Sequence, residues 1–252
     1  MGGNLMMIRD GVLEGPKVEK TLSLHLWNDK PVGWINVAKG PVMAGAELFT
    51  INLTGKGGHG AVPDTTIDPI VAAAHIITAL QTIASRNVAP LQSVVVSVTS
   101  IHSGTTFNVI PQTAQLSGTI RTFDLEVRKL VLERFEQIVK GIAESMGCRV
   151  EIETKRVTPA VINNDEVAAS IFESAQALFP DTQIDTENFL TMGAEDMGYM
   201  QEKVDGCYFF IGSANHEKHL DYNHHHPKFD FDEQALIQGT ALMAAAAANF
   251  LK

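Results

Sequence analysis

The fold is decided by residues 47–63, which read ELFTINLTGKGGHGAVP. The first half of this stretch alternates apolar and polar residues, which is typical of a strand with one buried face. The second half is a glycine-rich loop that lacks both the Lys-Ser/Thr pair of a phosphate loop and the spacing of a dinucleotide-binding loop. We interpret its glycines as places where the backbone and His59 approach another group closely. The alternative is a flexible hairpin tip.

The residues that follow complete a small domain with its own sheet. Helices are predicted at 68–85 and 125–146, and further strands at 91–101, 113–122 and 148–155. The resulting order, from Glu47 to Arg156, is β-α-β-β-α-β, which is the ferredoxin-like pattern. Two helices would cover one face of an antiparallel sheet, leaving the other face or an edge strand for a partner.

The sequence on both sides of this domain has an α/β pattern. Strands are predicted at 18–27 and 207–212, and helices at 165–178 and 232–251. We therefore expect residues 1–46 and 158–252 to form one α/β domain, with residues 47–157 inserted as a second domain. Insertions of this kind are tolerated when the two ends of the inserted segment lie close together.

Composition narrows the class of protein. The 252 residues are 45% apolar and 19% charged, with a formal net charge of −10. This acidic balance excludes nucleic acid and anionic membranes as main partners, and no apolar run is long enough to span a membrane. Cys148 and Cys207 have neither zinc-finger nor redox spacing, which favours a reducing compartment, and we expect the cytoplasm.

Histidines mark the candidate chemistry. His224, His225 and His226 are consecutive and precede Pro227. Neutral imidazole is a good ligand for zinc, nickel, manganese or cobalt, although adjacent histidines cannot all bind one metal. The alternative is a solvated polar loop. His25 lies near the C-terminal end of the predicted strand 18–27, where ligands collect in open α/β sheets, or it is a hydrogen-bonded structural residue.

Six short motifs occur in order along the chain. They are LHLW at 24–27, GKGGHGAVP at 55–63, FNVIP at 107–111, GTIR at 118–121, GAED at 193–196 and HHHP at 224–227. Together they resemble the metal-dependent amidohydrolase family, which includes hippurate hydrolases, N-acyl-amino-acid deacylases, plant auxin-conjugate hydrolases and related carboxypeptidases. The resemblance covers essentially the whole chain. It implies a phosphorylase/hydrolase-like α/β catalytic domain interrupted by a ferredoxin-like lid that also forms a homodimer.

The resemblance also implies a two-metal site. His25 and His225 match one ligand of each metal ion, which would be zinc, manganese, cobalt or nickel. His224 and His226 would then lie beside the metals or in solvent. Glu195 matches a carboxylate close to the metal ions.

In the lid, the resemblance implies contacts with the substrate. His59 matches a histidine that reaches the active site of the partner subunit, where it would donate to the developing oxyanion. Asn108 and Arg121 match residues that hold the free carboxylate of the substrate, a task that suits the fork of an arginine. The substrate would be an N-acyl amino acid or a small peptide.

The sequence departs from the family where the remaining chemistry is expected. A cysteine, a histidine and a glutamate that bind metal, and a glutamate that acts as general base, have no counterpart here. Asp64 also follows Pro63 where relatives often carry a histidine. We therefore expect an incomplete ligand set, a truncated catalytic domain and no activity from this chain alone. The alternatives to an amidohydrolase are an incompetent remnant that acts as a dimerisation module, and a metal-binding protein without catalysis.

Overall fold

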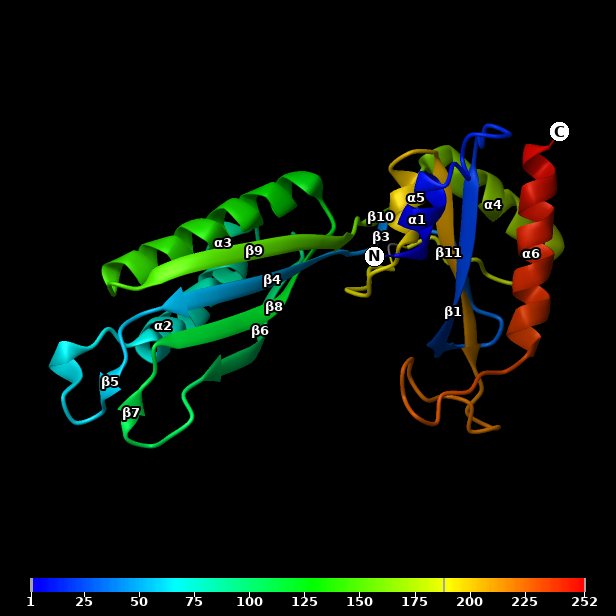
Figure 1. The fold of residues 1–252 in the computed structure, drawn as a ribbon. Coiled ribbons are helices and arrows are strands. Elements are labelled where there is room, and N and C mark those ends of the chain that lie inside the picture. The colour runs from blue at the N-terminus through cyan, green and yellow to red at the C-terminus, as the bar shows by residue number, and fades with distance from the viewer. Residues whose placement is uncertain (1, 188, 252) are drawn as a thin grey trace. The chain divides into compact units, whose positions relative to one another are not determined.

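The computed structural model describes residues 2–187 and 189–251, and it divides the chain into two compact units. Unit 1 comprises Met1–Ala44 and Pro159–Lys252, and unit 2 comprises Gly45–Thr158. Both units combine helices with sheets (Figure 1), so the predicted mixed α/β class is confirmed. No helix among the described residues is long and apolar enough to cross a membrane.

Unit 2 is built on a four-stranded antiparallel sheet with the strand order β6-β8-β4-β9. Its strands are β4 (Gly45–Thr54), β6 (Val94–Ser103), β8 (Thr113–Thr122) and β9 (Arg149–Thr158), and its long helices are α2 (Pro69–Thr82) and α3 (Leu125–Ser145). A short π-helical turn, Ile83–Asn87, ends α2. Along the chain the strands of this sheet and the two long helices run β4-α2-β6-β8-α3-β9, so the predicted ferredoxin-like order is confirmed.

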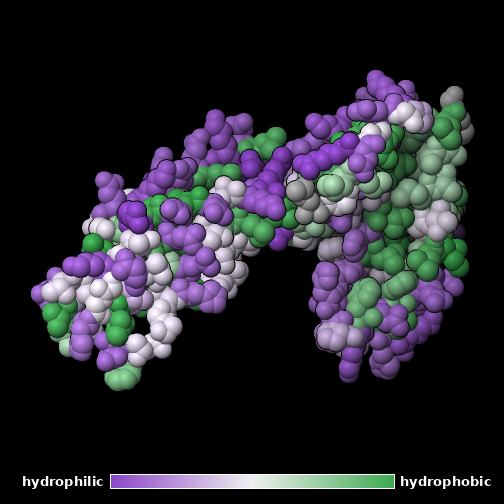
Figure 2. Space-filling view, viewed as in Figure 1, coloured by the Kyte–Doolittle hydropathy of each residue, from purple (hydrophilic) through white to green (hydrophobic). Residues whose placement is uncertain are grey.

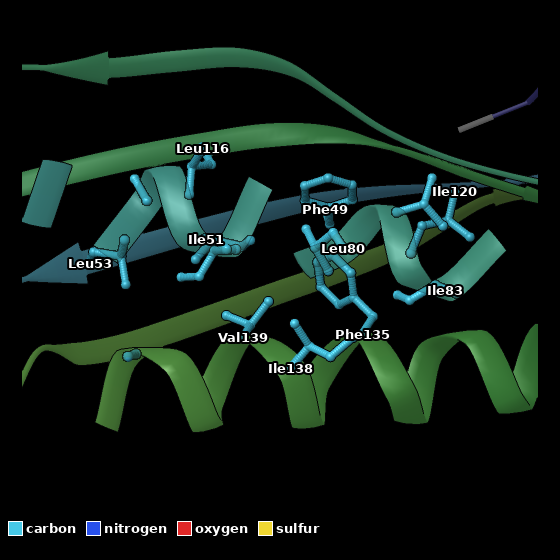
Figure 3. Packing of buried hydrophobic residues seen from close by; sticks show 14 of the residues in the cluster. Phe49, Ile51, Leu53, Leu80, Ile83, Leu116, Ile120, Phe135, Ile138 and Val139 are labelled. Atoms are coloured by element: carbon cyan, nitrogen blue, oxygen red, sulfur yellow. The ribbon is translucent and has the colours of Figure 1, made fainter. Parts of the chain in front are cut away.

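Local sequence explains these elements. Along β8 the residues alternate between exposed and buried, because successive side chains of a strand point to opposite faces. Asp68 and Asp124 cap the two helices: each accepts backbone N–H bonds from the first turn. Figure 3 shows the apolar side chains packed between the sheet and the helices. The ring centroids of Phe49 and Phe135 are 4.7 Å apart.

The core of unit 2 predicts independent folding. Its apolar cluster draws on all four strands and both long helices, so no partner is required to bury it. Excised residues 45–158 are expected to unfold cooperatively in urea, with amide exchange that is slow in β4 and β8. A fragment that shows far-ultraviolet circular dichroism without cooperative unfolding would contradict this expectation.

Unit 1 contains a three-stranded sheet with the order β1-β11-β2. The strands are β1 (Thr21–Pro31), β2 (Ile35–Asn36) and β11 (Gly206–Ala214), and β1 and β11 are parallel. A second pair joins β3 (Gly40–Met43) and β10 (Val161–Asn163), and the helices are α1 (Gly3–Arg9), α4 (Asp165–Leu178), α5 (Met197–Gln201) and α6 (Gln234–Phe250). Every residue of β11 is buried, as expected for the central strand of a covered sheet.

The edge strand β1 leaves apolar surface exposed. Leu24 and Leu26 line a cavity of about 400 Å³ against α6, and Leu236 and Ile237 on that helix are 48% and 64% exposed. In Figure 2 apolar side chains gather over α6 and the neighbouring strand on the visible face. Unit 1 therefore exposes apolar surface along β1 and α6.

Candidate functional site

One cavity of unit 1 has a volume of about 750 Å³ and is lined by histidines from two segments that are far apart in the sequence. It is lined by His25, Trp27, Met43, Gly193, Ala194, Glu195, His224, His225, His226 and Phe229. These residues come from β1, β3, the segment before α5, and the long connection between β11 and α6 (Figure 1). The structure thus brings together His25, His225 and Glu195, which the family resemblance had placed at one two-metal site.

His25 lies in the middle of β1 and not near the end of its strand. The predicted strand ended at Trp27, but β1 continues to Pro31 through an irregularity after Trp27. The Nδ1 of His25 is 2.5 Å from the carbonyl oxygen of Leu26. A carbonyl oxygen can only accept, so in the neutral ring Nδ1 carries the proton and the lone pair is on Nε2. This arrangement is common in histidines that bind metals through Nε2.

The histidine run folds as a tight turn in which the two flanking rings accept hydrogen bonds from different segments. The backbone N–H of Asn28 donates to Nε2 of His224 at 3.3 Å, and the backbone N–H of Lys228 donates to Nδ1 of His226 at 3.1 Å. His225 lies between them with a left-handed φ of 64°. One nitrogen of each flanking ring is therefore occupied by a backbone N–H, from β1 for His224 and from the turn itself for His226.

The His224 ring faces His25, with a centroid distance of 5.1 Å and an interplanar angle of 86°. Burial lowers the pKa of His224, and so do the neighbouring imidazoles of His25 and His225, while Asp29 opposes them. The ring is therefore held in its neutral form. This suits the hydrogen bond that it accepts from the backbone.

Glu195 belongs to the segment that leads into α5. Its Oε2 lies 3.4 Å from the backbone nitrogen of Met197, and the next residue, Asp196, accepts a 2.9 Å hydrogen bond from the backbone N–H of Asn4. Burial raises the pKa of the Tyr208 hydroxyl, followed by the charges of Glu195 and Asp196. The segment thus places two carboxylates beside a buried phenol.

The donor chemistry of the cavity suits divalent transition metals, because imidazole and carboxylate are their usual ligands. Within residues 2–187 and 189–251, however, no group of three or more His, Cys, Asp and Glu side chains could hold a metal ion. Both cysteines are free and buried. The described residues therefore fit a part of a metal centre and do not complete one.

His59 and Asn108 lie side by side in unit 2. The short strands β5 (Gly58–His59) and β7 (Val109–Ile110) pair with each other, and the N–H of Gly60 donates to the carbonyl of Asn108 at 2.8 Å. A Cβ at Gly57 would lie 2.9 Å from the Ile110 oxygen, so the group that the glycine-rich loop approaches is this neighbouring segment. The Nδ1 of His59 accepts from the N–H of Ala61 at 3.1 Å, which leaves Nε2–H free to donate.

Arg121 lies elsewhere in the same unit. It is near the end of β8, whereas β5 and β7 adjoin the start of that strand, where the Gly55 N–H donates to the Gln112 carbonyl. A ten-residue strand is about 30 Å long. Within one copy of unit 2, Arg121 therefore does not meet His59 and Asn108.

Comparisons with known proteins identify the family of the chain. The family described as Peptidase family M20/M25/M40 matches residues 1–249. The chain belongs to this family. The resemblance inferred from the six motifs is thereby confirmed.

Individual relatives cover most of the chain. An N-acetylcysteine deacetylase of Bacillus subtilis is 37% identical over 99% of this chain and 63% of its own length. A hippurate hydrolase of Campylobacter jejuni is 33% identical over the whole chain and 64% of its own length. A crystal structure of a dinuclear metal-binding M20 peptidase from Bacillus subtilis has a TM-score of 0.79 at 33% identity, covering 97% of this chain and 60% of that one. The M20 chain described here thus spans less than two thirds of these relatives.

Sequence analysis assigned no role of their own to several residues at or beside this M20 cavity. Trp27 packs against His224 at 4.9 Å and Phe229 packs against it at 5.4 Å, so an aromatic wall holds that imidazole. Asn28 also donates hydrogen bonds to the histidine connection, which is the segment between β11 and α6 that carries residues 224–226. Aromatic residues beside a histidine motif could have signalled the wall. No local pattern signalled Asn28.

In the M20 chain a buried carboxylate, that of Asp232, joins the beginning and the end of the connection between β11 and α6. Asp232 accepts hydrogen bonds from Lys218 Nζ at 2.9 Å, from the Gln234 backbone at 3.1 Å and from Asn215 Nδ2 at 2.6 Å. The Lys218 contact, followed by the Gln234 and Asn215 contacts, lowers the pKa of Asp232 from 3.8 to about 2.

This pKa predicts a pH dependence of stability. The folded pKa of Asp232 is below its unfolded value, so the stabilisation is present above about pH 4 and is lost as the pH falls to about 2. Asp232→Asn is expected to remove this part of the pH dependence and to lower stability at pH 7. Urea unfolding of both proteins between pH 2 and 7 measures their free energies of unfolding. Parallel curves for the two proteins would contradict the assignment.

Proposed function

We propose that this chain is part of a metal-dependent amidohydrolase that cleaves the amide bond of N-acyl amino acids or small peptides. The observation that carries the proposal is the gathering of His25, His225 and Glu195 around one cavity of unit 1. The relatives support it, since they include a deacetylase of N-acetylcysteine and a hippurate hydrolase.

His25 and His225 would each hold one of two divalent ions, zinc, manganese, cobalt or nickel, with Glu195 nearby. The ions would supply Lewis acidity and activate water for attack on the amide. Because the described residues do not complete a centre, we propose that further ligands and the general base come from outside this chain, and that the chain alone is inactive.

The substrate contacts would come from unit 2. His59 presents its Nε2–H as a donor for the oxyanion of the tetrahedral intermediate, since backbone N–H occupies the other ring nitrogen. The amide of Asn108 and the guanidinium of Arg121 would bind the carboxylate of the substrate. The length of β8 separates these groups within one copy, so a small substrate could reach all three only when two copies contribute. This geometry supports a homodimer formed through unit 2.

A hydrolysis assay tests the proposal. Residues 1–252, alone and joined to the preceding segment of an M20 relative, are incubated with manganese or zinc and with N-acetyl and N-benzoyl amino acids. We expect turnover only from the completed protein. Arg121→Ala should raise KM about 100-fold with a smaller change in kcat, because it removes a charge-assisted contact to the substrate.

A second candidate is a dimerisation or metal-binding module without catalysis, which the incomplete ligand set favours. A completed protein that binds metal without turnover of any N-acyl amino acid would support this candidate over the amidohydrolase.

A further inference from the structure

Asn28 connects three separate parts of unit 1 through one buried side chain. It follows His25 by three positions in β1 and is 0% exposed. Its Nδ2 donates to the carbonyl oxygen of Tyr222 at 2.7 Å and to that of Asp230 at 2.9 Å. Its Oδ1 accepts from Ser213 Oγ of β11 at 2.8 Å. The side chain thus ties β1 and β11 to the connection that carries the histidines.

Asn28 Nδ2 contacts three carbonyls, of which the two at shorter distance flank the histidine turn, one on each side, while the third, that of Leu220 at 3.5 Å, lies earlier in the same connection. Tyr222 precedes residues 224–226 and Asp230 follows them, so one amide group closes the loop at its base. The backbone N–H of Asn28 also donates to His224 inside the turn. Asn28, in the strand that bears His25, therefore makes hydrogen bonds to the segments before and after the turn and to one of its rings.

Only an amide meets all of these demands. Two carbonyl oxygens require two N–H donors, and the Ser213 hydroxyl requires an acceptor. Aspartate has the same shape but offers no donor when ionised, so its charge would face two carbonyl oxygens. Leaving buried groups unpaired costs more than the hydrogen bond itself contributes.

The connection needs such an anchor because of its length. It runs from the end of β11 at Ala214 to the start of α6 at Gln234. Connections longer than about 12–15 residues without regular structure are mobile unless they are fastened, and they often carry function.

We propose that Asn28 is the positioning residue of the histidine turn and holds His225, together with His224 that faces His25, at the cavity. The inference rests on the proposed function in treating that cavity as the hydrolytic site. It assigns to Asn28 no contact with substrate or metal.

Unit 1 offers a matched control. Asn163 is also buried, at 3% exposure, and its Nδ2 donates to the carbonyls of Ala38 at 2.8 Å and Tyr208 at 2.9 Å. Its Oδ1 accepts from the Tyr208 backbone at 2.7 Å. Asn163→Asp therefore repeats the same chemical change at a site that does not bind the histidine connection.

The test compares Asn28→Asp, Asn163→Asp and the unchanged chain by reaction with diethyl pyrocarbonate, with each modified histidine located by mass spectrometry. Near-ultraviolet circular dichroism selects conditions in which all three proteins are folded. We expect His224 to react at least about 10-fold faster in Asn28→Asp, because two hydrogen bonds close the turn. The rate in Asn163→Asp is expected to stay within about 2-fold.

Equal His224 rates in the unchanged chain and in Asn28→Asp would overturn the inference, and so would equal acceleration in Asn163→Asp. If Asn28→Asp does not fold, Ser213→Ala, which removes only the hydroxyl that orients the amide, is expected to accelerate the reaction about 3-fold. No acceleration in that variant would overturn the inference as well. The readout requires neither metal nor turnover. An inactive completed protein that still shows the specific acceleration would therefore reject the proposed function and retain the role of Asn28.

Discussion

Replacing His25 by glutamine is expected to weaken the binding of manganese or zinc by at least about 100-fold and to abolish hydrolysis by the completed protein. The Nδ1 of His25 is committed to the Leu26 carbonyl, so the free lone pair on Nε2 is the group that a metal can use. Glutamine keeps a polar side chain of similar length but has no imidazole nitrogen. Isothermal titration with manganese or zinc measures the loss.

The matched control is His75→Gln. His75 is an exposed residue of α2 in unit 2 and does not line the cavity. The substitution His75→Gln should leave both metal affinity and turnover unchanged. Unaltered metal binding by His25→Gln would instead favour the second candidate, in which the histidine turn binds metal by itself.

Much of the fold was predictable because its signals are local. The alternation in residues 113–122 reproduces β8 to the residue, and the helix predicted at 165–178 matches α4. Elements that are too short to show the periodicity of a helix or a strand were missed. Among them are the five-residue α5 and the short β3-β10 pair. The predicted strand at 91–101 is observed at Val94–Ser103, because the Ala89–Gln92 turn occupies its first residues.

From residue types alone the candidate site was predictable one residue at a time, and only the family resemblance placed His25, His225 and Glu195 at one site. The histidines were visible as residue types, but the hydrogen bonds that place them join distant positions. Asn28 and its carbonyl partners are 194 and 202 residues apart in sequence. No periodic pattern in the sequence indicates a hydrogen bond between residues so far apart. The metal and substrate roles assigned to His25, His225, His59, Asn108, Arg121 and Glu195 remain predictions.

The largest expected loss of stability in unit 2 follows from Gly118→Ala. Gly118 lies in β8 between β6 and β4, and a Cβ there would be 2.0 Å from the Ser97 carbonyl oxygen and 2.4 Å from Cζ of Phe49. The oxygen belongs to the backbone of the sheet, and the ring packs against Phe135 in the core. Neither group can move away without breaking a strand pairing or the packing of the helices. We expect a loss of about 3 kcal/mol or more, the upper range for an overpacked core.

Gly141→Ala is the control that separates this steric effect from the general effect of replacing a glycine. Gly141 lies in α3, and a Cβ there would meet nothing within 4 Å. The change should stabilise unit 2 by about 0.5–1 kcal/mol, because alanine is the better helix former. Thermal unfolding of the whole chain by calorimetry measures both variants. If the two units unfold separately, only the transition of unit 2 should move, downward for Gly118→Ala and upward for Gly141→Ala. Equal shifts in the two transitions would show that unit 2 does not fold independently, since a defect confined to its sheet would then destabilise unit 1 as well.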